Sequence, residues 1–185
     1  MHKKILVFAV VAFILSTGIS YGEELRQKKP FTPAPAALAP YIMTEKDMPG
    51  MTLTMQFPLS WKVAGEDGGE YRPSSTRQEW TYEDGFAIYI NYYLLQSKDD
   101  IYNNIATHPA IKHGQWLDGS FSGGAVGDVS WVSNETTNCK FILVAHGKYL
   151  VMVENECSSR AEELKLEGTV LESIAQKVLD KLPAN

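Results

Sequence analysis

The chain has 185 residues, of which 22 are acidic and 17 basic, and its formal net charge at pH 7 is −5. This acidic balance disfavours proteins that hold nucleic acid or anionic lipid through clustered lysine and arginine side chains. The length, less the N-terminal segments described next, suits one domain with a single hydrophobic core.

Residues 1–22 have the three parts of a secretory signal. Two lysines precede an apolar run of eleven residues, Ile5–Leu15, and Ser20 and Gly22 place small side chains at the expected cleavage site. A run of this length is short of the roughly 20 residues that span a bilayer, so cleavage is favoured over an uncleaved anchor. We therefore predict a periplasmic or secreted protein without an integral membrane segment. Loss of the two lysines would change its formal charge from −5 to −7.

Residues 23–43 are predicted to form a flexible tail rich in proline and alanine. Four prolines occur in the eleven residues from Pro30 to Pro40. Because proline lacks an amide N–H and fixes φ, such a stretch is incompatible with a helix interior or a central strand. The tail is either an unstructured leader or a semi-rigid spacer. A single folded domain is expected over residues 44–185.

The first half of this domain has the pattern of strands. Apolar and polar residues alternate over Met51–Phe57, which is typical of a strand with one buried face. Residues 64–76 are acidic and rich in glycine and serine, which predicts a loop, and Gln78–Tyr82 follows as a short strand. A turn at residues 83–85 leads into Phe86–Leu95, where aromatic and β-branched residues predict the strongest strand of the chain.

A helix is expected after this strand. Ser97 is followed three residues later by Asp100, the spacing of a capping box, and Pro109 would end or bend the helix. A glycine-rich loop over residues 119–127 then precedes a strand near Val129–Ser133.

The last third predicts a hairpin and a closing helix. The apolar runs Cys139–Ala145 and Tyr149–Asn155 are separated by a three-residue turn that contains Gly147. A second capping box at Ser159–Glu162 opens an amphipathic helix that Pro183 ends. The whole pattern predicts an α+β domain, with a mostly antiparallel β-sheet, helices packed on it and a C-terminal amphipathic helix.

Cys139 and Cys157 are predicted to form a structural disulfide, because paired cysteines in an exported chain are usually bonded. A hairpin centred on Lys148 would place the two residues opposite each other on neighbouring strands. The bond would then close the open end of the hairpin and contribute about 3 kcal/mol. The alternative, a redox-active or metal-binding pair, lacks the Cys-x-x-Cys spacing that would support it.

No segment carries an established catalytic, nucleotide or metal motif. His108 and His113 are five residues apart with a proline between them, which does not suit a metal-binding helix face. Residues 113–122 contain histidine, aspartate and serine, but no Gly-x-Ser-x-Gly sequence supports a hydrolase. The acidic residues of the 64–76 loop lack the spacing of a calcium loop. We expect no catalytic residue, no cofactor and no metal site.

Aromatic residues on the two strands before the first helix are the candidate binding residues. Alternation places Tyr89 and Tyr93 on the same face of their strand, and Trp80 and Tyr82 lie on the strand before it. If the face is exposed, it would form a platform for an apolar ligand or a partner protein. If a helix covers it, these rings belong to the core.

The order of several short motifs resembles that of bacterial extracytoplasmic PsbP-like domains over residues 50–182. These motifs are Phe57-Pro58 with Trp61, Gly127-Asp128 before Trp131, the segment from Phe141 through Gly147-Lys148-Tyr149, and a closing helix to Leu182. The resemblance implies an antiparallel sheet flanked by helices and a binding or accessory role, and it transfers no functional residue.

The sequence therefore predicts an exported, non-enzymatic binding or accessory protein of the bacterial envelope. Its expected partner is an envelope protein or a small apolar ligand. Two alternatives stay open, a periplasmic carrier with a ligand pocket between sheet and helices, and a small secreted hydrolase.

Overall fold

The computed structural model describes residues 31–108, 127, 129–132, 141–156 and 168–183. The chain divides into two units, Met1–Pro30 and Phe31–Asn185, and the fold described here is that of the second unit. Among the described residues, no helix is long and apolar enough to cross a membrane. In chain order the elements are β1 (Met51–Phe57), β2 (Val63–Ala64), β3 (Glu70–Tyr71), β4 (Ser74–Tyr82), β5 (Ala87–Leu94), α2 (Lys98–Asn104), the 3₁₀ turn η1 (Ile105–Thr107), β6 (Val129–Val132), β7 (Phe141–His146), β8 (Tyr149–Asn155) and α5 (Gly168–Leu179).

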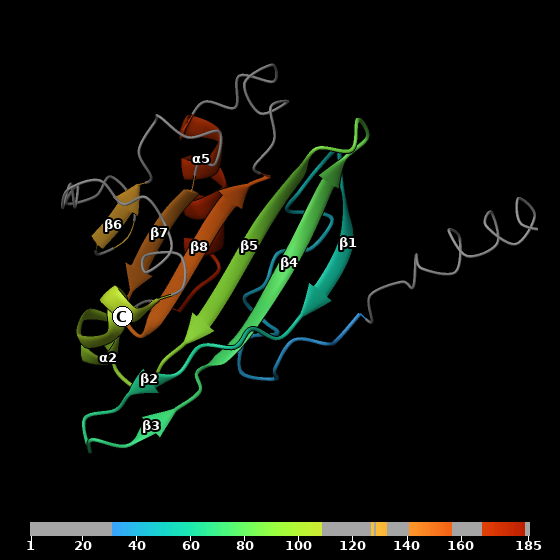
Figure 1. The fold of residues 1–185 in the computed structure, drawn as a ribbon. Coiled ribbons are helices and arrows are strands. Elements are labelled where there is room, and N and C mark those ends of the chain that lie inside the picture. The colour runs from blue at the N-terminus through green and yellow to red at the C-terminus, as the bar shows by residue number, and fades with distance from the viewer. Residues whose placement is uncertain (1–30, 109–126, 128, 133–140, 157–167, 184–185) are drawn as a thin grey trace, which may run out of the picture. The chain divides into compact units, whose positions relative to one another are not determined.

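Six strands form one antiparallel sheet in the order β1-β4-β5-β8-β7-β6 (Figure 1). Two tight turns connect neighbouring strands, β4 to β5 at Gly85 and β7 to β8 at Gly147, whose φ angles are 86° and 53°. Glycine adopts such positive angles without a steric penalty, which fixes both hairpins. Strands β2 and β3 form a separate two-stranded ribbon. An α+β fold dominated by antiparallel sheet, as predicted, is confirmed.

The β7–β8 hairpin has a slightly different register from the predicted one. His146 pairs with Tyr149 and Phe141 pairs with Glu154, so the axis lies between Gly147 and Lys148 and not on Lys148. The cause is a two-residue turn where the sequence suggested three residues. The predicted disulfide between Cys139 and Cys157 lies outside the described residues.

One face of the sheet packs against α5, and we call it the α5 face. Helix α5 covers the β7 and β8 half of this face, since Ile174 and Val178 share a cluster with Val144 and Val151. The predicted start of this helix at Ser159 lies outside the described residues. The buried members that α5, the sheet and its β4–β5 turn contribute to the cluster are Trp80, Phe86, Ile88, Ile90, Tyr92, Ile142, Val144, Tyr149, Val151, Val153, Leu171, Ile174, Ala175, Val178 and Leu179.

The opposite face, which we call the α2 face, carries a second core. Ser97 caps α2 as predicted, with its hydroxyl accepting from the Asp100 amide. Ile101 of this helix is fully buried against the sheet. Because both faces are covered at the centre, β8 is apolar at almost every position instead of alternating. The core members are Trp61, Val63, Tyr93, Leu95, Ile101, Leu143, Ala145, Leu150 and Met152.

Strand β4 begins at Ser74, four residues before the predicted Gln78. The predicted loop over residues 64–76 therefore ends early, and part of it forms the β2–β3 ribbon. Ser75 and Thr76 are buried opposite Tyr93 and Tyr92 of β5. Small polar side chains fit there because the large rings across the strand fill the space, a pairing that local composition does not show.

Residues 31–48, which we call the strap, belong to the folded domain, so the predicted tail boundary at residue 43 is wrong. The strap makes a turn in which the Leu38 and Ala39 amides donate to the Pro35 carbonyl. Leu38 and Met43 are each 1% exposed within the α5-face core. Prolines do exclude helix and central strand here, as expected. They also restrict the unfolded chain, which lowers the entropic cost of ordering the segment.

Candidate functional site

An open groove of about 710 Å³ runs between the strap and strands β1 and β4. Its volume is in the range of known ligand sites, roughly 300–1,000 Å³. Phe31, at the start of the strap, is 56% exposed, although it is one of the largest apolar side chains of the chain. We call this feature the strap groove, and its lining residues are Phe31, Pro33, Ala34, Ala39, Ile42, Met43, Thr44, Glu45, Lys46, Leu53, Gln56, Gln78 and Trp80.

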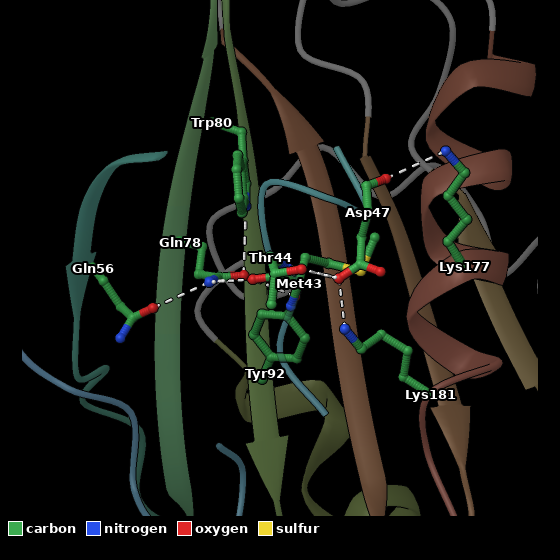
Figure 2. Close-up of polar contacts among 9 residues, drawn as sticks. All are labelled: Met43, Thr44, Asp47, Gln56, Gln78, Trp80, Tyr92, Lys177 and Lys181. Atoms are coloured by element: carbon green, nitrogen blue, oxygen red, sulfur yellow. Dashed lines mark hydrogen bonds and ion pairs between the residues drawn. The ribbon is translucent and has the colours of Figure 1, made fainter. Parts of the chain in front are cut away.

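A buried amide network, whose hydrogen bonds Figure 2 shows, includes Gln56, Gln78 and Trp80 of the groove lining and forms its floor. The Gln78 Nε2 amide donates to the Met43 carbonyl and to Gln56 Oε1, both at 3.0 Å. Its Oε1 accepts from the Tyr92 hydroxyl at 3.0 Å and from Trp80 Nε1 at 3.4 Å. All four hydrogen-bonding positions of this side chain are therefore used, as a fully buried amide requires.

The same network fixes the strap to the sheet at two points. The Met43 amide donates to the Tyr92 hydroxyl at 3.1 Å, so Met43 binds the sheet through both its N–H and its carbonyl. Near the start of the strap, the Thr32 amide donates to the Gln56 carbonyl, and Gln56 Nε2 donates back to the Thr32 carbonyl. Burial raises the pKa of the Tyr92 phenol above its ordinary value, which keeps this hydroxyl a neutral donor. These hydrogen bonds fix the position of the strap relative to β1, β4 and β5, and with it the shape of the groove.

A polar latch joins the end of the strap to α5 (Figure 2). Asp47 Oδ2 accepts from the Thr44 amide and hydroxyl, both at 2.8 Å, and pairs with Lys181 Nζ at 2.5 Å. Lys177 Nζ donates to the Asp47 carbonyl at 3.4 Å. The hydrogen bond from Lys181, followed by those from Thr44, lowers the pKa of Asp47 to about 2. The Asp47 carboxylate of the folded protein is therefore ionised at neutral pH.

The four predicted binding residues do not form one surface. Trp80 and Tyr82 lie on the α5 face, whereas Tyr89 and Tyr93 lie on the α2 face. Trp80 is fully buried in the groove floor, and Tyr93 is 4% exposed. The predicted alternation of Tyr89 and Tyr93 is correct, but a platform that includes Tyr93 is not available.

Tyr93 is covered by an aromatic cluster on the α2 face. Its ring meets Trp61 edge-on at 5.4 Å and His108 at 5.2 Å between centroids. Burial lowers the pKa of His108 to about 4, so this imidazole is neutral near pH 7. The described residues contain no group of three or more side chains that could hold a metal ion. The segment 113–122, which would hold the alternative hydrolase site, lies outside them.

Tyr89 is the one candidate ring on the α2 face that keeps partial exposure. The Arg77 guanidinium lies 4.1 Å from the centre of this ring and forms an ion pair with Glu154 at 2.7 Å. Sequence reasoning missed both charged residues, because the pairing of β4 with β5 and of β5 with β8 brings them together.

The predicted acidic loop is part of the β2–β3 ribbon. Asp67 Oδ1 accepts from the Gly69 amide at 2.9 Å, and Glu70 pairs with Lys62 at 3.3 Å. The bond from Gly69 to Asp67 shapes the turn between β2 and β3.

The strap groove itself was also missed by sequence reasoning, because its outer wall was assigned to a tail. One signal was available. Gln78 alternates with Arg77 and Glu79 and shares its face of β4 with Trp80, and a buried amide in a strand requires partners from another segment. Gln56 carries no such signal, because it lies on the polar side of the alternation in β1, and a β-bulge between Leu53 and Met55 turns it toward Gln78. Comparison with family models, with curated proteins and with solved structures finds no match to this chain.

Proposed function

We propose that this protein is an exported, non-enzymatic binding protein that holds a small apolar ligand in the strap groove. The observation that carries the proposal is the groove itself, about 710 Å³ of open space with mostly apolar walls. Apolar ligands bind such sites because contact with the walls removes hydrocarbon surface from water. The exposed ring of Phe31 offers a contact at the edge.

The floor of the groove favours binding over catalysis. Gln78 has no hydrogen-bonding position left, and the Tyr92 hydroxyl already donates and accepts. A general acid or base must be able to exchange a proton with the substrate, and neither group can do so without breaking the network. The floor therefore supports the shape of the groove and offers a ligand no free hydrogen-bonding group from Gln78 or Tyr92.

Other parts of the proposal rest on the sequence. They are export through residues 1–22, the Cys139–Cys157 disulfide, and the accessory role that the PsbP-like resemblance implies. The predicted amphipathic helix from Ser159 to the C-terminus also belongs here, with Gly168–Leu179 as its described part. Export and a disulfide are compatible, because oxidising compartments keep cysteines paired.

A groove-filling variant tests the ligand site. Ala39 lines the groove, whereas Ala37 is an exposed alanine of the same turn outside it. We expect Ala39→Trp to weaken binding of the uncharged fluorophore N-phenyl-1-naphthylamine by about tenfold or more, because the indole would occupy the space that the probe uses. The matched variant Ala37→Trp should bind the probe as the wild type does. Equal affinities in all three proteins, or no binding to the wild type, would contradict the proposal.

A further inference from the structure

A row of charged residues crosses the α2 face of the sheet, on the side opposite the strap groove. In the register of β4, β5 and β8, Glu79 and Glu154 pair directly with Tyr89 from its two sides. Their Cβ atoms are thus roughly 5 Å from that of Tyr89. We call these three residues the Tyr89 row.

Negative charge exceeds positive charge around this row. Arg77 is the cation that the structure places there, and it is bound to Glu154 at 2.7 Å. Glu79 accepts from the Thr54 hydroxyl at 3.0 Å and has no cationic partner among the described residues. Glu156, just after β8, is a third carboxylate whose field reaches Tyr89, and the row with Arg77 and Glu156 carries a net charge of −2.

A buried acceptor next to the row lacks a donor. Asn91 is 1% exposed and pairs across the strands with Arg77, and its Nδ2 donates to Glu154 Oε1 at 3.5 Å. Its Oδ1 has no hydrogen-bond partner. A buried carbonyl oxygen without a donor is costly, so an N–H group entering beside Arg77 would satisfy an existing deficit.

We propose that the Tyr89 row binds a basic, extended segment of a partner protein. Excess carboxylate and an unpartnered acceptor both favour ammonium or guanidinium groups. Neighbouring strands are about 4.8 Å apart, so Glu79 and Glu154 are separated by roughly 10 Å across the sheet. Alternate residues of an extended segment are about 6.5 Å apart, and long flexible side chains such as lysine can span the difference between this spacing and the separation of the two carboxylates. The row therefore matches two basic side chains on one segment better than one small amine.

The test uses a fluorescein-labelled peptide of alternating lysine and serine and the full mature chain at low salt, about 50 mM, where surface charges are weakly screened. We expect saturable binding that the double variant Glu79→Gln/Glu154→Gln weakens by about fivefold or more. The matched variant Glu66→Gln/Glu172→Gln removes the same charge from the β2–β3 ribbon and from α5, and it should change the affinity less than twofold. A peptide of alternating glutamate and serine should not bind.

Glu79→Gln alone keeps the experiment interpretable if loss of Glu154 affects folding, because the bond from Glu79 to Thr54 can be retained by glutamine. Thermal unfolding of each variant checks this. Equal weakening by both double variants would assign the binding to overall charge and overturn the proposal. If N-acetyl-lysine amide bound as tightly as the peptide, the claim that the row binds an extended segment would be wrong.

Discussion

Gln78 shows at the scale of one residue why the strap is ordered. Its amide is fully buried, and it connects β1, β5 and the strap through three hydrogen bonds, with a fourth to Trp80 of its own strand. Each hydrogen bond adds only modestly to the free energy of unfolding. Removing one member of the network costs more, because its partners are then buried without a donor or an acceptor.

Replacing Gln78 by leucine should therefore destabilise the protein strongly. The substitution keeps the approximate volume but leaves the Tyr92 hydroxyl, Trp80 Nε1 and the Met43 carbonyl without their partners, which we expect to cost about 3 kcal/mol of unfolding free energy. Urea unfolding measures it. The control Gln96→Leu, at an exposed position, should change stability by less than about 0.5 kcal/mol. A loss of the same small size in both variants would show that the network does not hold the strap.

At the scale of elements, the strap is joined by the Asp47–Lys181 pair to the turn that follows α5, and the two side chains are 29% and 25% exposed. Solvent screens such a pair, so its contribution is modest, of the order of 1 kcal/mol or less. The lowered pKa of Asp47 gives this contribution a defined dependence on pH. A carboxyl group with a pKa near 2 in the fold and 3.8 when unfolded stabilises the fold above pH 4, and the effect is lost as the pH falls toward 2.

The variant Asp47→Asn isolates this contribution. The difference in unfolding free energy between wild type and variant should be constant above about pH 5 and should shrink between pH 4 and pH 2, because only the wild type takes up a proton there. Denaturant unfolding at a series of pH values gives the curve. A difference that stays the same down to pH 2 would mean that Asp47 is not the group whose pKa the latch lowers.

The elements also show how far the sequence alone can predict this fold. Strands β1 and β8 match their predicted bounds, and β5 differs by one residue at each end, because alternation and β-branched residues mark them locally. The strap was missed because proline-rich composition has no period that reveals packing. Its order depends on Gln56 and Gln78, which come later in the chain.

The candidate site was predictable only in part, for the same reason. The alternation along β5 correctly put Tyr89 and Tyr93 on one face. Their different exposure depends on Trp61 and His108, which are distant in sequence and cover only Tyr93. Arg77 and Glu154 become neighbours through strand register, which single-strand patterns do not specify.

At the scale of the whole molecule, the sheet separates two surfaces of different chemistry. The α5 face carries the apolar strap groove next to β1 and β4, and the α2 face carries the Tyr89 row. Because the two surfaces lie on opposite faces of β4, Glu79→Gln should leave ligand binding in the groove unchanged. Under the two proposals, a ligand and a partner protein would therefore bind at the same time without competing.

The most direct measurement for the central claim is a native mass spectrum of the protein purified from its own host, recorded for the wild type and for Ala39→Trp. We predict that the wild type carries a small apolar molecule that is released on collisional activation, because the strap groove buries part of its surface. The variant, with the groove filled, should be free of it. A wild type without a bound molecule, or the same molecule retained equally by both proteins, would contradict the claim that the strap groove is the ligand site.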